Sequence, residues 1–483
     1  MPSLADLPTE LVQAILQHTT KEDCLSLTTV NRRLSNEATA RLYQNITFEW
    51  EKEEIPPVSK ILRTLLEDAH LRPLVKSLDL SGSGYQYGKQ AYIFSPTVPP
   101  LELDTMDRAS SLIRSTGFPH MEAWETALRE SSLDAVLALL VILLPELIRL
   151  SITQKFAKDT HILSQTVLHA AQSTARDGGD ERGGDFRPDV SKLQDVTICQ
   201  RRLGDALSRY LCPFKNTPEI LGWFYLPSAQ RLRLSIDNPF NFAWPSPLPP
   251  QPQHLQTLFL DQIREFRALP ILAACSGIKE LNWNLRQESG VDSDVLPRLT
   301  VDLQKLGEAL VPLRDSLEVL TIGGELEQGI HEELETPPVT YTGFMDLSML
   351  TKVKTLAAPW IFYMGKKLQE RKTIGRPSTV PPNLTRLIIN DGFEHDDAND
   401  WDESDMLEAS RNFLEVRRPQ HTPYLRELGL HPAYLEDVSK KELRPLAEKL
   451  GIEFSSVNTF DEKWLNTPPL PHCWTWDPPP HAS

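Results

Sequence analysis

The chain has 483 residues, which is more than one hydrophobic core usually organises, so its length predicts several domains or one extended repeat array. Hydrophobic residues make up 40% of the chain and charged residues 24%, which is typical of folded proteins and excludes disorder over most of the length. The formal net charge of -16 repels the phosphate backbone of DNA and RNA, and we expect no nucleic-acid partner.

The first fifty residues divide into three short amphipathic helical pieces. Pro8 and Glu10 suit a first helical turn, because proline needs no hydrogen bond there and a carboxylate faces the positive end of the helix dipole. Leu11, Ile15 and Leu16 then share one apolar face. That face is predicted to need a partner.

The second and third pieces follow directly. The stretch from Thr20 to Asp23 has the form of a capping box that starts a helix, and Leu34, Ala38 and Leu42 recur at the four-residue spacing of a third helix. Three helices this short bury little surface, and we expect them not to close a dry core alone. Another surface should therefore cover part of their apolar residues.

These pieces together resemble an F-box of the kind found in fungal proteins. The resemblance depends on Leu7-Pro8, Glu10-Leu11, Ile15-Leu16, the acid-led second helix, Val30 to Leu34 and Leu42-Tyr43. Asn31 and Leu34 depart from the family, which often has Cys and an aromatic residue there, but both keep the helix and its apolar face. The alternative is that the three helices only cap the N-terminal end of a downstream array.

The resemblance implies a function by docking. An F-box binds a Skp-type adaptor, which a cullin scaffold holds together with the ubiquitin-transfer machinery. Physically this is the insertion of apolar helical anchors into a groove. The adaptor-binding residues implied by the resemblance are Leu7, Pro8, Leu11, Ile15, Leu16, Leu25, Val30 and Leu42.

The longest apolar run, Val136–Leu144, is too short to cross a bilayer and predicts a buried helix. Asp6 and Glu10 lie where a secretory signal would need a basic start and an apolar stretch. Five cysteines are scattered without any Cys-x-x-Cys pair, so we expect reduced thiols and neither a disulfide framework nor a zinc site. We therefore expect no membrane partner and a cytoplasmic or nuclear location, or both.

One hexad pattern, apolar-x-x-apolar-x-apolar, recurs along the rest of the chain. Its ten copies are Val75–Leu80, Leu147–Ile152, Leu193–Ile198, Ala229–Leu234, Leu255–Leu260, Ile278–Trp283, Leu317–Ile322, Val353–Ala358, Leu384–Ile389 and Leu425–Leu430. Helical stretches precede many copies, as at residues 60–69, 133–144, 203–211 and 303–310. A final helix and strand are expected at residues 446–454.

Repeated helix-then-strand units predict an α/β fold: an irregular leucine-rich-repeat solenoid with parallel strands on the concave face and helices outside. The alternative is a doubly wound α/β domain, against which no glycine-rich phosphate turn follows any strand. We expect an F-box-like module at residues 1–50, the array at 51–465 and a Pro/Trp-rich tail at 466–483. Insertions are expected at about residues 82–120, 173–190 and 391–410.

No enzyme signature survives inspection of the sequence. The twelve histidines form no His-Glu-x-x-His motif, and no phosphate loop or nucleophile elbow is complete, so we expect no catalytic, cofactor or metal site. Side chains that alternate with the apolar pair should face the open side of the sheet and bind a protein substrate, although insertion loops serve equally well for that purpose. The candidates are Arg149, Arg231, Arg233, Phe259, Asn282, Asn284 and Arg386.

The leading hypothesis is therefore a non-enzymatic substrate receptor of an SCF-type (Skp, cullin, F-box) ubiquitin ligase. A second hypothesis is a protein that binds the Skp adaptor without ubiquitin transfer. A third is a plain scaffold whose first helices are only a cap. The apolar set Leu7, Leu11, Ile15 and Leu16 separates the first two from the third, because a cap would bury these residues against the array.

Overall fold

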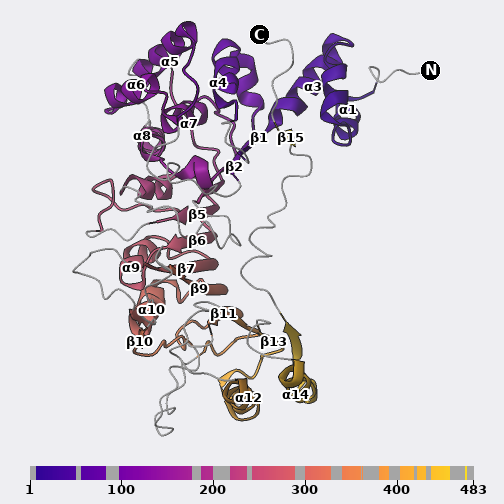
Figure 1. The fold of residues 1–483 in the computed structure, drawn as a ribbon, viewed down its shortest axis with the longest axis vertical. Helices are drawn as coiled ribbons and strands as arrows, with labels where there is room; N and C mark the ends of the chain where they lie inside the picture. Colours follow the sequence, from indigo (N-terminus) through magenta and orange to yellow (C-terminus); the bar gives the residue numbers. More distant parts are fainter. Residues whose placement is uncertain are drawn as a thin grey trace, which may run out of the picture.

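A single long sheet organises the molecule. The computed structural model describes residues 7–50, 56–82, 97–176, 186–199, 218–236, 242–288, 300–327, 340–359, 362, 380–390, 403–417, 421–430, 437–456 and 474–475. Within them, thirteen strands pair in the order β14-β13-β12-β11-β9-β7-β6-β5-β4-β3-β2-β1-β15, and every pairing is parallel (Figure 1). Strands follow one another along the sheet in chain order, apart from β15. This confirms the predicted α/β fold class and is consistent with a leucine-rich-repeat-type solenoid.

The structure confirms the strands predicted at the hexads. Each hexad ends in one of the strands β2 to β7, β9 and β11 to β13. The strand bounds are β1 Asn45–Trp50, β2 Ser77–Gly82, β3 Arg149–Thr153, β4 Asp195–Cys199, β5 Arg231–Ser235, β6 Thr257–Gln262, β7 Glu280–Glu288, β9 Val319–Glu327, β11 Thr355–Pro359, β12 Arg386–Asn390, β13 Glu427–Leu430, β14 Glu453–Ser456 and β15 Trp474–Thr475. A second sheet pairs β8 Thr300–Asp302 with β10 Thr340–Thr342.

Helices connect many of the successive strands and lie along one side of the column of strands for much of the chain (Figure 1). Their bounds are α1 Thr9–Leu16, α2 Lys21–Leu27, α3 Arg32–Gln44, α4 Val58–Glu67, α5 Leu103–Ser115, α6 Met121–Arg129, α7 Leu133–Ile142, α8 His161–Arg176, α9 Glu265–Ala274, α10 Leu303–Leu310, α12 Glu403–Asn412 and α14 Asp437–Lys449. Short 3-10 helices include η2 Ala69–Leu74 and η5 Pro218–Tyr225. The helices expected at 60–69, 133–144 and 303–310 are confirmed as α4, α7 and α10, and the one expected at 203–211 lies outside the described residues.

The expected insertions are partly helical. Helix α5 lies within the segment 82–120, and α12 begins inside the segment 391–410. Residues 83–96, 177–185 and 391–402 lie outside the described residues, as does the tail at 466–483 apart from β15. The expected closing helix and strand correspond to α14 and β14.

The apolar residues of the hexads form the main core, because they face the helices while their neighbours in sequence face the other way. Leu78, Leu80, Leu232 and Leu234 are at most 1% exposed. Helix α7 is buried on all sides, which confirms the buried helix expected at Val136–Leu144. No helix in the described part of the chain is long and apolar enough to cross a membrane.

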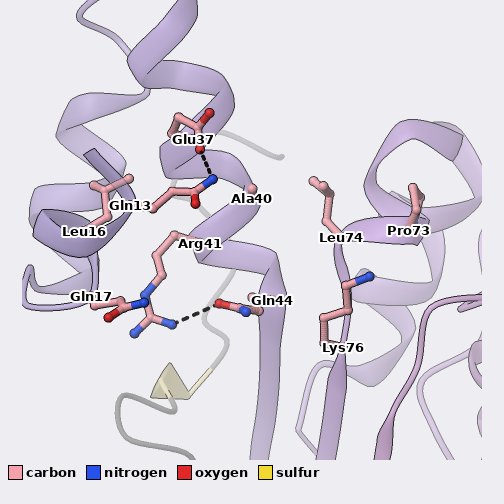
Figure 2. A pocket seen from close by; sticks show the side chains of 10 residues that line it. All are labelled: Gln13, Leu16, Gln17, Glu37, Ala40, Arg41, Gln44, Pro73, Leu74 and Lys76. Carbon is pink, nitrogen blue, oxygen red and sulfur yellow. Dashed lines mark hydrogen bonds between the residues drawn. The ribbon is translucent and has the colours of Figure 1, made fainter. Parts of the chain in front are cut away.

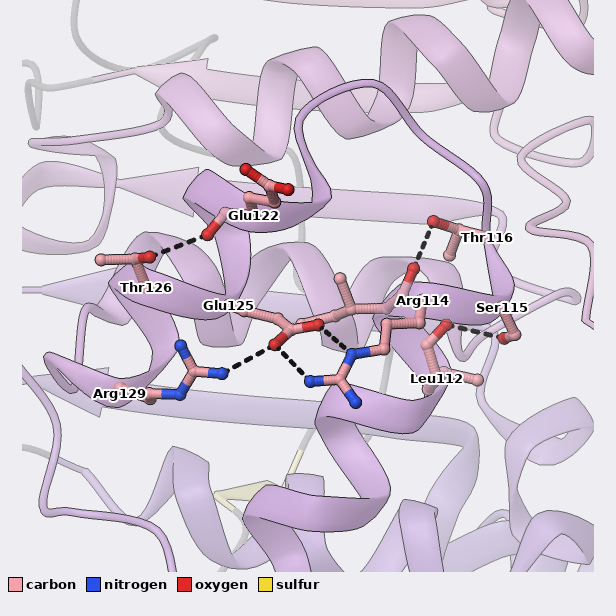
Figure 3. A network of polar contacts seen from close by, with 9 residues as sticks. Leu112, Arg114, Ser115, Thr116, Glu122, Glu125, Thr126 and Arg129 are labelled. Carbon is pink, nitrogen blue, oxygen red and sulfur yellow. Dashed lines mark hydrogen bonds and ion pairs between the residues drawn. The ribbon is translucent and has the colours of Figure 1, made fainter.

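Helices α5 and α6 are joined by a carboxylate held between two guanidinium groups (Figure 3). Arg114 Nε and Nη2 donate to the two oxygens of Glu125 at 2.7 and 2.8 Å, and Arg129 Nη2 donates to Glu125 Oε2 at 2.8 Å. The hydrogen bond from Arg114 lowers the pKa of Glu125. Both arginines remain more than half exposed, so solvent screens this contact and it orients the two helices more than it stabilises them.

Asp134 of α7 anchors the start of α8. It is 3% exposed, and its carboxyl oxygens accept backbone N–H groups of Ile162 at 2.7 Å and Leu163 at 3.0 Å. Burial, with a smaller contribution from the Asp159 carboxylate, raises the pKa of Asp134 to about 8, although the backbone N–H groups oppose the rise. The folded chain therefore retains a proton at Asp134 that the unfolded chain releases above a pH of about 4.

This proton makes stability depend on pH. A group with a raised folded-state pKa contributes stability that is lost as pH rises from the unfolded-state pKa to the folded-state pKa, so the melting temperature should fall between about pH 4 and about pH 8. The change Asp134→Asn removes the ionisation and should flatten this dependence, whatever its effect on the absolute melting temperature. Thermal melts of both proteins across this range test the expectation. Equal slopes of melting temperature against pH in the two proteins would show that another titrating group causes the pH dependence.

Candidate functional site

The first three helices form a module with its own small core. Thr20 caps α2 by accepting from Asp23 N, while the Asp23 carboxylate accepts from Thr20 N, which confirms the predicted capping box. Asn31 caps α3 through a bond from Leu34 N at 2.9 Å. The buried residues of the module, which form a cluster separate from the main core, are Val12, Leu16, Cys24, Leu34 and Ala38.

Two expectations about this module are wrong. The helices do close a small core by themselves, because α2 and α3 supply apolar residues opposite α1. Leu16 lies in that core at 2% exposure and does not belong to an exposed set. The reason is helical periodicity: Val12 and Leu16 form the stripe that faces α2 and α3, and the stripe of Leu11 and Ile15 is rotated away from it.

The outer stripe of the module is apolar and exposed. Leu11 is 51% exposed, Ile15 is 40% exposed, and Val30, in the turn before α3, is 60% exposed. Of the remaining candidates for adaptor binding, Pro8 is exposed and three are partly buried, two of them, Leu7 and Leu42, against the module's core. Those three are Leu7, Leu25 and Leu42. The stripe of Leu11 and Ile15, with Val30, is called the outer stripe below.

The module is joined to the array without a linker. Helix α3 ends at Gln44 and β1 begins at Asn45, so the last turn of the helix leads straight into the first strand. The Gln44 carbonyl accepts a hydrogen bond from Lys76 N at 2.9 Å, which ties this junction to β2. The outer stripe is therefore held in a fixed orientation relative to the sheet.

A cavity of about 350 Å³ lies between the module and η2 (Figure 2). Gln13 donates to Glu37 at 2.9 Å across α1 and α3, and Arg41 donates to Gln44 at 3.3 Å. The lining residues are Gln13, Leu16, Gln17, Glu37, Ala40, Arg41, Gln44, Pro73, Leu74 and Lys76. This lining offers one carboxylate among amides and cations, and it holds neither a nucleophile nor a pair of acids.

The candidate substrate-binding residues lie on the face of the sheet opposite the core. Strand register places them in rows that cross the sheet. The first row is Asn45, Ser77, Arg149, Asp195, Arg231, Thr257, Glu280, Val319, Thr355, Arg386, Glu427 and Glu453. The middle row is Thr47, Asp79, Ser151, Thr197, Arg233, Phe259, Asn282, Thr321, Ala357, Ile388, Gly429 and Ser455.

The first row brings two of the candidate arginines onto one carboxylate. Arg149 Nε lies 3.3 Å and Arg231 Nη2 lies 2.6 Å from Asp195 Oδ2. Arg231 is half exposed, with a side-chain exposure of 50%. Arg386 lies apart from them on β12, where it pairs with Glu427 at 2.8 Å. The candidates therefore form no single site.

Three of the candidates are not accessible, so the expectation of an open position is wrong for them. Phe259 is 3% exposed, Asn282 is 0% exposed and Asn284 is 1% exposed. Asn284 Nδ2 donates to Asp261 Oδ1 at 2.9 Å, and Ser235 donates to the other oxygen of that carboxylate at the same distance. Strand alternation predicts which face of the sheet these side chains lie on. Whether they are buried depends on contacts with residues that are distant in sequence.

The described residues contain no cluster that fits a metal ion and no exposed cysteine thiol. Among the described residues, no group of three or more His, Cys, Asp and Glu side chains is placed to hold a metal ion. Cys24, Cys199 and Cys275 are buried, and none of them forms a disulfide with another described residue. Burial raises the pKa of the Cys275 thiol, which keeps it protonated and inert.

Comparison with known proteins does not identify the chain. No family model matches it, and no curated protein matches it at a significant level. The outer stripe and the sheet face must therefore be interpreted from their physical properties.

Proposed function

We propose that this chain is the substrate receptor of an SCF-type ubiquitin ligase: the helical module docks onto a Skp-type adaptor, and the array holds a protein substrate. The observation that carries the proposal is the outer stripe. Three aliphatic side chains stay exposed on a module that already has its own core, and such anchors are what helix-in-groove docking requires.

The same observation weighs against a simple cap. A cap would turn its apolar residues onto the end of the array, whereas Leu11, Ile15 and Val30 face solvent. The direct junction of α3 and β1 also suits a receptor, because a substrate on the array would be held at a fixed position relative to the scaffold. The resemblance of residues 7–43 to an F-box adds the identity of the adaptor.

A second candidate function is a scaffold that binds the Skp-type adaptor without ubiquitin transfer. The outer stripe favours it equally, since the stripe concerns adaptor docking alone. The two functions differ in whether cullin joins the complex and the partner held by the array becomes ubiquitinated.

Co-purification with purified Skp-type adaptor and cullin tests the proposal. We expect the full chain to form a ternary complex, with adaptor binding in the nanomolar to micromolar range measured by calorimetry. A binary complex that never recruits cullin would favour the scaffold, and absence of adaptor binding would overturn both.

A further inference from the structure

The middle row contains a cation without a counter-ion. Arg233 of β5 forms no ion pair with any acidic side chain in the described ranges, and its Nε is buried without a hydrogen-bond acceptor. Its guanidinium lies 4.6 Å from the centre of the Phe259 ring on the neighbouring strand β6. Stacking on an aromatic ring orients a guanidinium but leaves its donors unused.

A second arginine lies beside it on the same face. Arg231 is two residues earlier on β5, so both side chains leave the strand in the same direction. Arg231 and Arg149 share the single carboxylate of Asp195, whose Oδ2 meets both groups. Arg233 takes no part in this pairing.

Two further carboxylates lie on the same face, and neither forms a salt bridge with Arg231 or Arg233 in the described part of the chain. Asp261 on β6 is 3% exposed, and its oxygens accept from Ser235 and Asn284. Asp79 on β2 is partly buried; burial raises its pKa, and a hydrogen bond with Ser151 and the Arg149 guanidinium oppose the rise. Among the described residues the Arg233 guanidinium thus has no carboxylate partner, although the chain carries a net charge of -16.

An unsatisfied polar group continues the same row. Asn282 on β7 follows Phe259 in register, is fully buried, and has no hydrogen bond to either side-chain atom within the described residues. Buried amides normally have partners, since each missing bond costs free energy. Two positions of the middle row, Arg233 Nε on β5 and the Asn282 amide on β7, therefore lack hydrogen-bond partners within the described residues.

We infer that the sheet face over β3 to β6 binds an acidic extended segment of a protein partner, whose carboxylates pair with Arg233 and Arg231. This deepens the proposed function by naming the chemistry of the substrate segment, and it rests on the array being the substrate-binding part. Planar guanidinium groups pair with carboxylates through two parallel hydrogen bonds, and Phe259 holds Arg233 ready for that geometry. A nucleic acid is disfavoured because the chain as a whole repels it.

The test measures fluorescence anisotropy of the full chain with three labelled decapeptide pools. One pool alternates random residues with Asp or Glu, the second with Lys or Arg, and the third with Ser or Gln. We expect the acidic pool to bind most tightly and its affinity to fall with added salt, as for any contact between charged groups. Equal binding of the three pools would overturn the inference.

Three variants separate this surface from the rest of the molecule. Arg233→Ala should weaken binding of the acidic pool about tenfold, because an oriented charged contact is lost. Arg314→Ala is the control: this arginine lies in the turn before β9, is 60% exposed and pairs with Asp315, and its loss should leave affinity unchanged. Arg233→Lys keeps the charge but not the planar fork and should recover only part of the affinity.

The result is independent of adaptor docking. Leu11→Asp in the outer stripe should leave peptide binding intact, and Arg233→Ala should leave adaptor binding intact. Wild-type affinity for the acidic pool in the Arg233→Ala protein would overturn the inference even where the Skp-type adaptor binds. Loss of adaptor binding with peptide selectivity retained would instead count against the proposed function alone.

Discussion

Replacing Leu11 and Ile15 together by Asp is expected to abolish binding of the Skp-type adaptor without unfolding the chain. Both side chains are exposed, so two carboxylates cost the free protein little. In the complex they would be desolvated in an apolar groove, and burying an unpaired charge is far more costly than losing an aliphatic contact. We expect the affinity to fall at least about a hundredfold by calorimetry.

The matched control lies one residue along the same helix. Val12→Ala with Leu16→Ala removes methyl groups from the core of the module, and core truncations of this kind cost about 2–5 kcal/mol for the leucine alone. This pair should lose helical signal on mild heating, whereas the Asp pair should not. If the Asp pair also melted early, the outer stripe would be part of the fold and the docking proposal would lose its main support.

The strands of the array could be predicted from the sequence because the hexad pattern depends only on residues that are close together in the chain. Two apolar residues that alternate with other residues at the end of each hexad predict both a strand and the face of it that is buried. All ten hexads end in strands of one sheet. Strand β1 has the same alternation at Ile46, Phe48 and Trp50, but it follows α3 without a break. No turn signal separates the two, so the sequence pattern alone predicts no strand at these residues.

The candidate site was harder to predict than the fold. The four-residue spacing of Leu11 and Ile15 is repeated by Val12 and Leu16, and a helix presents the two pairs only about 100° apart. Which pair is inside depends on where α2 and α3 lie. Likewise, Arg231 and Asn282 alternate with apolar residues in the same way, yet one is exposed and the other fully buried. Such differences come from tertiary contacts that one strand does not encode.

The second large effect is expected at a buried ion pair that holds the start of α9. Arg264 and Glu265 are adjacent in sequence, and their side chains are only 5% and 2% exposed. Arg264 Nε and Nη2 donate to the two Glu265 oxygens at 3.0 Å, and Glu265 Oε1 also accepts from Asp302 N at 3.2 Å. The pair thus links α9 to the end of β8.

Glu265→Ala should destabilise the chain by about 3–5 kcal/mol, because it leaves the Arg264 guanidinium buried without its carboxylate. The double change Arg264→Met and Glu265→Leu removes both charges and fills the space, and it should lie close to wild type. Urea unfolding followed by circular dichroism gives both values. A double variant as unstable as Glu265→Ala would mean that the ion pair stabilises the fold by more than its desolvation costs. Glu125→Ala, at the screened pair of α5 and α6, should lose less than Glu265→Ala, because its arginines are exposed to water.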